Sequence, residues 1–307
     1  AGGYFSVLTA QDGVIFAEAE EKALQRQFEQ AEQRFEVGLT AVTDVHEARA
    51  SYDNARARAI VSKNNLADAK EALYELTGQY FDDIDPLQEV LPLVKPIPET
   101  PEEWVELAMQ YNPAVVSARF GVEIADSTVK LQRSGHFPTL DLVASYSSFT
   151  NNEYVFRPTP DPDDSFRTDL TNDDTRISLQ LSVPIYQGGV VSSRTRQARH
   201  LLNAVNEDLD QQQKAVIRAT NNAYRAVIAG IEQVGALGQA MISAESALEA
   251  TQAGFEVGTR TIVDVLIAQQ RYFQAQRDNS LARHTYVVDH LRLKAAAGVL
   301  EESDLQK

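Results

Sequence analysis

The chain has 307 residues, a formal net charge of −16 and no cysteine. The absence of cysteine excludes disulfides, thiolate metal sites and thiol catalysis. The acidic balance argues against nucleic acid as a partner, because phosphate binding needs a surplus of lysine and arginine. No stretch offers about 18 consecutive apolar residues, so a membrane role would have to come from β-strands.

The chain begins with two segments of strong helix formers on either side of Gly38. A glycine between two helices supplies the positive φ angle at which the chain can end one helix and reverse. Gly78 has the same place after the second segment and is expected to cap it. We therefore predict that residues 1–78 form a long helical hairpin.

Residues 79–101 contain five prolines, which exclude a helix interior, and are expected to form an irregular connector. Helices resume over 102–135 in two pieces. Asn112 followed by Pro113 has the pattern of an N-cap and a first-turn proline, so the second piece is expected to begin there.

The hydrophobic period changes from helical to alternating within residues 136–187, over 136–149 and again over 175–186. Each run has about the ten residues that a tilted transmembrane β-strand needs. The polar segment between them, with Pro158, Pro160 and Pro162, is expected to be a long hairpin loop. Periodicity alone equally allows a soluble hairpin with one face on a protein core.

Residues 188–300 are predicted to form a second, longer helical hairpin, which turns at Gly258 and ends at Gly298. Its first helix should run from Val190 to about Glu256, or roughly 100 Å at about 1.5 Å per residue. Helices of this length must pack side by side in a coiled-coil arrangement. Residues 301–307 form a short polar tail.

The two helical hairpins are copies of one unit. Phe255 follows Phe35 by 220 residues (255 − 35), and Asp264 follows Asp44 by the same 220 (264 − 44). A register held this long without a gap indicates an internal repeat. The second copy is preceded by helices and a hairpin that the first copy lacks, so we expect the chain to be a fragment that begins in mid-repeat.

The sequence shows no pattern of catalytic or ligand-binding chemistry. Its five histidines lack ligand spacing on any one helix face, and it has no phosphate-binding glycine loop and no nucleophile elbow. No enzyme activity, cofactor or metal is therefore predicted.

Three separated motifs carry a resemblance to a known family. They are Gly135–Leu142, Leu181–Gly189 and Val257–Leu266, and in this order they closely resemble the TolC outer-membrane efflux channels. The resemblance implies a mainly α fold with a β-hairpin. Long antiparallel helical hairpins would be staves of a coiled-coil tunnel, and the two strands would belong to a transmembrane β-barrel.

The same resemblance implies a duct in the outer membrane and periplasm of a Gram-negative bacterium, belonging to a tripartite efflux or type I secretion system. The full-length protein would be a homotrimer that contacts outer-membrane lipid. A periplasmic adaptor would dock at the helix tips, and an inner-membrane pump of the RND, ABC or MFS type would supply drugs or proteins for passive export.

In that family the tips close the tunnel. By resemblance, Thr43 and Arg260 match positions that bond between neighbouring helix pairs. Asp44 matches the acceptor of a second link whose partner is a tyrosine, but this chain has Phe255 there, so closure is expected to be weaker or to use another donor. For Arg260 the alternative is a solvated charge at the tip.

By the same resemblance, Asp264 matches one of two aspartate rings at the constriction, and Ile267 occupies the place of the other. Symmetry-related carboxylates close together repel one another and attract cations. The alternative for Asp264 is a carboxylate that serves its own helix start, where aspartate is favoured.

Two further sets of residues follow from the resemblance. The residues expected to dock an adaptor are Arg34, Val37, Gly38, Leu39, Val257, Gly258 and Thr259. The residues expected to face the barrel lumen are Arg176, Ser178, Gln180 and Ser182.

The alternative to a channel is a soluble, elongated coiled-coil adaptor or scaffold. A fragment with one of two hairpins would bring only half of the strands to a trimeric barrel, so we expect it not to form a normal pore.

Overall fold

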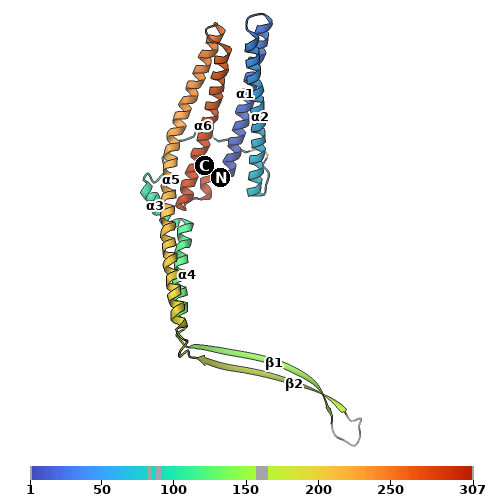
Figure 1. The fold of residues 1–307 in the computed structure, drawn as a ribbon, viewed down its shortest axis with the longest axis vertical. Coiled ribbons are helices and arrows are strands. Elements are labelled where there is room, and N and C mark those ends of the chain that lie inside the picture. Colours follow the sequence, from blue (N-terminus) through green and yellow to red (C-terminus); the bar gives the residue numbers. More distant parts are fainter. Residues whose placement is uncertain (1, 82–83, 88–90, 157–164, 306–307) are drawn as a thin grey trace. The chain divides into compact units, whose positions relative to one another are not determined.

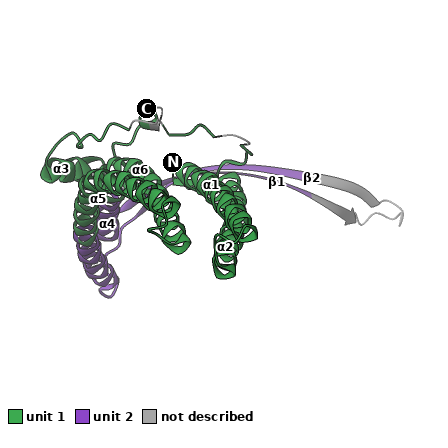
Figure 2. Cartoon of the chain, turned by 90° about the horizontal axis from the view of Figure 1, so that it is seen from above, with its two compact units in different colours: residues 1–116, 211–307 green, residues 117–210 purple. Residues whose placement is uncertain are grey.

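The computed structural model describes residues 2–81, 84–87, 91–156 and 165–305. The chain divides into two compact units, residues 1–116 with 211–307 and residues 117–210, as Figure 2 shows. The expected mainly helical fold with one β-hairpin is confirmed. The segment boundaries expected from the sequence remain a prediction.

The first unit contains both hairpin tips. The first hairpin consists of α1 (Gly2–Glu36) and α2 (Val42–Thr77), and the second consists of the later part of α5 (Val190–Glu256) and α6 (Ile262–Ala297), as labelled in Figure 1. The short polar tail contains a 3-10 helix, Glu302–Leu305, where Asp304 accepts the Glu301 backbone N–H and pairs with Lys294.

Glycine ends both α2 and α6, as expected. Gly78 has φ 70° and its N–H donates to the Tyr74 carbonyl, and Gly298 has φ 74° and donates to the Lys294 and Ala295 carbonyls. Positive φ angles of this kind are costly for residues with a Cβ atom.

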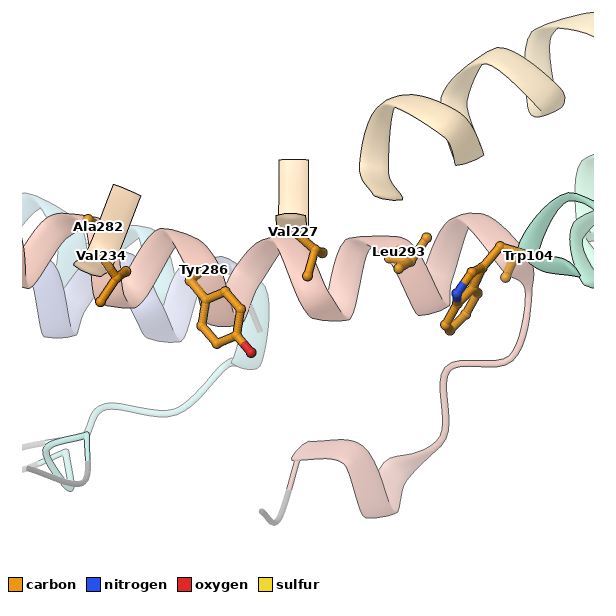
Figure 3. Packing of buried hydrophobic residues seen from close by; sticks show 7 residues of the cluster. Trp104, Val227, Val234, Ala282, Tyr286 and Leu293 are labelled. Carbon is orange, nitrogen blue, oxygen red and sulfur yellow. The ribbon is translucent and has the colours of Figure 1, made fainter. Parts of the chain in front are cut away.

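A buried apolar cluster joins α5, α6 and the short helix α3 (Pro101–Tyr111). Figure 3 shows its side chains along α6: Trp104, Val227, Val234, Ala282, Tyr286 and Leu293. The polar ends of its two large aromatic residues bond to the proline-rich connector. The Trp104 Nε1–H donates to the Pro98 carbonyl at 2.7 Å, and the Tyr286 hydroxyl donates to the Val94 carbonyl at 2.9 Å. The connector is thus fixed on the helices.

The end of α6 meets the junction between α3 and α4 (Pro113–Ser134) closely. Asn112 caps α4 as predicted, because its Oδ1 accepts the Ala114 N–H at 2.9 Å. Its Nδ2 donates to the Ala296 carbonyl at 2.8 Å. A Cβ atom on Gly298 would lie 2.5 Å from the Tyr111 carbonyl oxygen, so only glycine fits this contact.

Helix α1 meets α2 and α6 through different chemistry. Near the start of α1, Val7 and Leu8 pack with Leu73 of α2 in a buried apolar cluster. Further along α1, Leu24 and Ala31 pack with Ile262 and Leu266 of α6 in another apolar cluster. Over the first part of α1, by contrast, the contacts towards α6 are polar: Thr9 with His284, Asp12 with Ser280 and Glu20 with Arg277. These three pairs are called the polar seam below.

Three members of the polar seam are buried: Ser280, His284 and Glu20. His284 is 5% exposed; burial lowers its pKa, against the opposing effect of Asp12, and its Nδ1 lies 2.9 Å from the Thr9 hydroxyl. Glu20 is fully buried, and its two carboxylate oxygens accept from Arg58 of α2 at 2.8 Å and from Arg277 of α6 at 3.0 Å. One carboxylate therefore ties three helices together.

The second unit contains residues 117–210, with the hairpin of β1 (Thr139–Phe156) and β2 (Ser165–Ser182). The strands pair antiparallel along 18 residues each, so the expectation of about ten residues was too short. The second strand ends before the expected position, since Pro184 has no N–H for the ladder. The prolines of the expected loop lie outside the described residues.

By length and composition, α5 is the one helix among the described residues that could cross a membrane, with a mean hydropathy of 1.2 over its most apolar 18 residues. Such a result for a single helix is weak evidence of a span. In this chain α5 contributes Val227 and Val234 to the buried cluster shown in Figure 3.

Candidate functional site

The two hairpin tips have the same backbone. Gly38 has φ 77° and Gly258 has φ 79°. In the first tip the Gly38 N–H donates to the Phe35 carbonyl and the Leu39 N–H to the Arg34 carbonyl, at 2.9 and 2.8 Å. The second tip repeats both bonds 220 positions later, at 3.1 and 2.9 Å. The internal repeat predicted from the sequence therefore extends to individual hydrogen bonds.

The start of α6 is capped by a reciprocal pair of side chains. The Thr261 hydroxyl accepts the Asp264 N–H at 3.3 Å, and Asp264 Oδ2 accepts the Thr261 N–H at 3.0 Å and its hydroxyl at 2.9 Å. The backbone and side-chain bonds from Thr261, with the charge of Arg260, lower the pKa of Asp264. Within one chain Asp264 thus serves its own helix start, and its place in an acidic ring remains a proposal.

The start of α2 is built differently. Its N-cap residue is Ala41, which has no side-chain bond to offer. Asp44 instead accepts a hydrogen bond from the Thr40 hydroxyl. Asp44 therefore has a local threonine donor within its own tip, and Thr43 is exposed beside it. The expectation that closure at Asp44 is weaker or uses another donor remains a prediction.

The tips expose apolar side chains. Val37, Leu39 and Val257 are 68%, 77% and 76% exposed. Gly38, Gly258 and Thr259, of the same predicted docking set, are also exposed. Arg34 of that set is half-buried, and its guanidinium lies over the Phe255 ring, 4.5 Å from the ring centroid. Ile267 is exposed on α6.

Sequence reasoning missed two charged contacts: Arg34 on Phe255, and Glu20 between Arg58 and Arg277. For Glu20 a signal existed, because it lies three residues after Ala17 and four before Leu24, both on the buried face of α1. For Arg34 no local pattern indicates the partner, which belongs to the other copy.

We expect replacement of Thr261 by valine to raise the pKa of Asp264 towards its ordinary value, because the variant loses one of the two donors that favour the carboxylate. The rise should be partial, since the backbone N–H remains. The folded-state pKa is depressed, so this carboxylate stabilises the helix start above the unfolded-state pKa, and the stabilisation is lost as the pH falls through the folded-state value.

A ¹³C NMR titration of the Asp264 carboxyl carbon measures this shift. Thr259→Val is the matched control, because the Thr259 hydroxyl donates to the Gly254 carbonyl and not to Asp264. An unchanged titration in Thr261→Val, or an equal shift in the control, would contradict the assignment.

The β-hairpin brings the alternating patterns of its two strands into phase. Residues directly opposite each other in an antiparallel pair share a face. The apolar pairs on one face are Leu140 with Leu181, Leu142 with Leu179 and Ala144 with Ile177. These leucines and Ile177 are all 62–73% exposed. The chain thus presents a continuous apolar surface on one side of the sheet.

The opposite face carries the residues expected to line a lumen. Arg176, Ser178, Gln180 and Ser182 stand opposite Ser145, Val143, Asp141 and Thr139. Arg176 also lies 3.6 Å from the Asp174 carboxylate on the same face. The two faces therefore differ sharply in polarity, as a strand pair between lipid and water requires.

A chain that combines such a hairpin with duplicated long helical hairpins has the features of an outer-membrane channel subunit. A family model described as outer membrane efflux protein matches residues 1–79 and 104–299. The chain belongs to this family, whose members are channels of the outer membrane and periplasm rather than enzymes.

Two relatives and one solved structure illustrate the match. The outer membrane protein TolC of Vibrio cholerae serotype O1 is 40% identical over 99% of this chain and 68% of its own length. TolC of Escherichia coli strain K12 is 36% identical over 99% of this chain and 62% of its own length. A crystal structure of CusC has a TM-score of 0.77 at 17% identity, covering 96% of this chain and 66% of that one. The chain thus spans about two thirds of the length of these relatives.

Proposed function

We propose that the protein containing this chain is a passive export duct of the outer membrane, without catalysis of its own. In this proposal three copies share one barrel, an adaptor docks at the hairpin tips, and an inner-membrane pump delivers the exported compound. The observation that carries the proposal is the exposed apolar face of the hairpin, which both strands build in register.

Lipid is the partner that fits this apolar face. In hydrocarbon, backbone groups need internal partners, which strands obtain only in a closed barrel. Each described strand pairs with the other along one edge. Its second edge is available to strands of further hairpins, from the rest of the protein or from other copies. The family assignment likewise favours a channel over the soluble adaptor considered from the sequence.

The hairpin tips support the proposed gate and the proposed docking of an adaptor. Arg260 and Asp264 lie at the second tip, and the exposed Val37, Leu39 and Val257 offer an apolar surface to a partner protein. We propose that Thr43, Asp44, Phe255 and Arg260 lie at the contacts that close the mouth, and that Asp264 and Ile267 line its constriction.

We expect Leu179→Arg in the full-length protein to reduce assembly in the outer membrane, because an arginine facing lipid costs up to about 2–4 kcal/mol, with the largest cost at the bilayer midplane. Ser178→Arg is the matched control: it adds the same side chain one residue away, on the face that already contains Arg176. The folded trimer in isolated outer membranes is quantified by its resistance to unfolding in detergent. Equal assembly of the two variants would reject the assignment of the faces.

A further inference from the structure

The two tips have the same backbone, and each contains one arginine near its turn. The position of this arginine differs between the two tips. The 220-residue offset pairs Arg34 with Gly254 (34 + 220) and Thr40 with Arg260 (40 + 220). The first tip thus has its arginine before the turn, and the second has it after the turn. A glycine or a threonine occupies the corresponding place in the other copy.

Packing explains the exchange in the second tip. A Cβ atom on Gly254 would lie 2.8 Å from Cγ of Arg260. The Gly254 carbonyl also accepts the backbone N–H groups of Thr259 and Arg260, at 2.9 and 3.2 Å. Glycine at position 254 therefore lets the stem of Arg260 lie against the end of α5.

In the first tip the shorter Thr40 stands in place of Arg260 and bonds to Asp44. Arg34 instead contacts a residue of the second repeat in the same chain, Phe255. Its guanidinium lies 4.5 Å from the centroid of the Phe255 ring, within the range of a cation–π interaction. The contact joins the last turn of α1 to the last turn of α5.

Phe255 is held on its other sides by buried apolar residues. It packs against the cluster that contains Leu24 and Ala31 of α1, Ala48 and Ala55 of α2, and Ile262 and Leu266 of α6. The ring therefore lies between this cluster and the guanidinium. Because residue 255 is phenylalanine, it has no hydroxyl to donate a hydrogen bond. Arg34 contacts the face of its ring instead.

We infer that Arg34 is a positioning residue of the mouth, which acts through Phe255 to hold the second tip against the first within each chain. Arg260 and Asp264 lie on that second tip, within nine residues of Phe255 (264 − 255). The inference rests on the proposed gate at the tips. It assigns to Arg34 an intramolecular contact in place of the expected docking role.

The test uses the full-length channel and a pair of spin labels at the tips. Glu36 and Glu256 are the last residues of α1 and α5, both are exposed, and they are equivalent in the repeat (36 + 220). The chain has no cysteine, so in a full-length channel without cysteines elsewhere the two introduced cysteines take labels selectively. Mixing labelled with excess unlabelled protein isolates the distance within one chain.

Arg34→Gln and Phe255→Leu each should lengthen and broaden the distance between the labels, by shifting the tip equilibrium about two- to five-fold, the range of a partly exposed cation–π contact. The double variant should show no larger shift than either single variant, because both remove the same contact. Arg34→Lys should retain part of the wild-type distance distribution, because lysine can also make a cation–π contact. Arg26→Gln is the charge control, since Arg26 is exposed on the same helix two turns away.

Planar-bilayer recordings of the same variants separate the inference from the gate on which it rests. Arg34→Gln and Arg260→Ala are both expected to raise the closed-state conductance. If Arg260→Ala raises the conductance but Arg34→Gln changes neither conductance nor distance, the inference is overturned and the gate stands. If Arg34→Gln alters the distance and neither variant alters the conductance, the contact stands and the proposed gate fails. Additive shifts in the double variant would also overturn the inference.

Discussion

Replacing Gly298 with alanine is expected to destabilise the chain by about 2–5 kcal/mol. About 1–2 kcal/mol comes from placing a Cβ atom at positive φ, and the rest from overpacking. The new Cβ would lie 2.5 Å from the Tyr111 carbonyl oxygen and 2.8 Å from the Asn112 nitrogen. These are backbone atoms, so no side-chain rotation relieves the overlap.

Gly78→Ala is the matched control for this prediction. Gly78 has φ 70° and caps α2 as Gly298 caps α6, but a Cβ atom added to it would meet no other atom within 4 Å. Its replacement should therefore cost only the conformational part. Chemical denaturation measures the free energy of unfolding of the two variants. Equal decreases would show that overlap with Tyr111 and Asn112 does not add to the cost of Gly298→Ala.

Replacing Arg58 and Arg277 together by methionine is expected to cost about 3–5 kcal/mol, because it leaves the buried carboxylate of Glu20 without a cationic partner. Either single replacement should cost less, since the other arginine still bonds to one of the carboxylate oxygens. The free energy of unfolding, from chemical denaturation at neutral pH, is the measurement.

Adding Glu20→Met to the double variant should recover most of that loss. A buried ion pair or triad replaced as a whole by apolar residues of similar size is often neutral or stabilising, because the desolvation of all charges is removed together. A triple variant as unstable as the double variant would show that the arginines act through packing rather than charge.

The helices were largely predictable from the sequence because their ends carry local signals. Gly38, Gly78, Gly258 and Gly298 all have the positive φ angles expected of turns and caps, and Asn112 bonds as an N-cap. The 220-residue repeat then allowed each hairpin to support the prediction of the other. Such signals depend on a few neighbouring residues, which is why they can be read without tertiary structure.

The strands were underestimated for an equally physical reason. Alternation fades after Phe149, where asparagine and aspartate, which are depleted in strands, become frequent. The ladder nevertheless continues to Phe156 paired with Ser165. The length of these strands is set by their pairing with each other. Residue preferences along one strand do not show how far this pairing extends.

The tip contacts could be predicted only in part. The cap formed by Thr261 and Asp264 follows from adjacent sequence, and it agrees with the alternative role of Asp264 at its own helix start. The Arg34 contact depends on the other copy of the repeat. Aligning the copies reveals the exchanged arginines, but only the packing at Gly254 and Phe255 shows what the exchange allows.

The polar seam determines which helix pair in the first unit resists separation less. Thr9, Asp12 and Glu20 meet α6 through hydrogen bonds and an ion pair, which water can replace one at a time as the surfaces part. Val7 and Leu8 meet Leu73 of α2 through apolar contact, which water weakens only at a cost in exposed area. Glu20 also retains Arg58 when Arg277 leaves. Under a lateral pull, the first part of α1 is therefore expected to stay with α2 and to separate from α6, as far as the apolar contacts of Leu24 and Ala31 with α6.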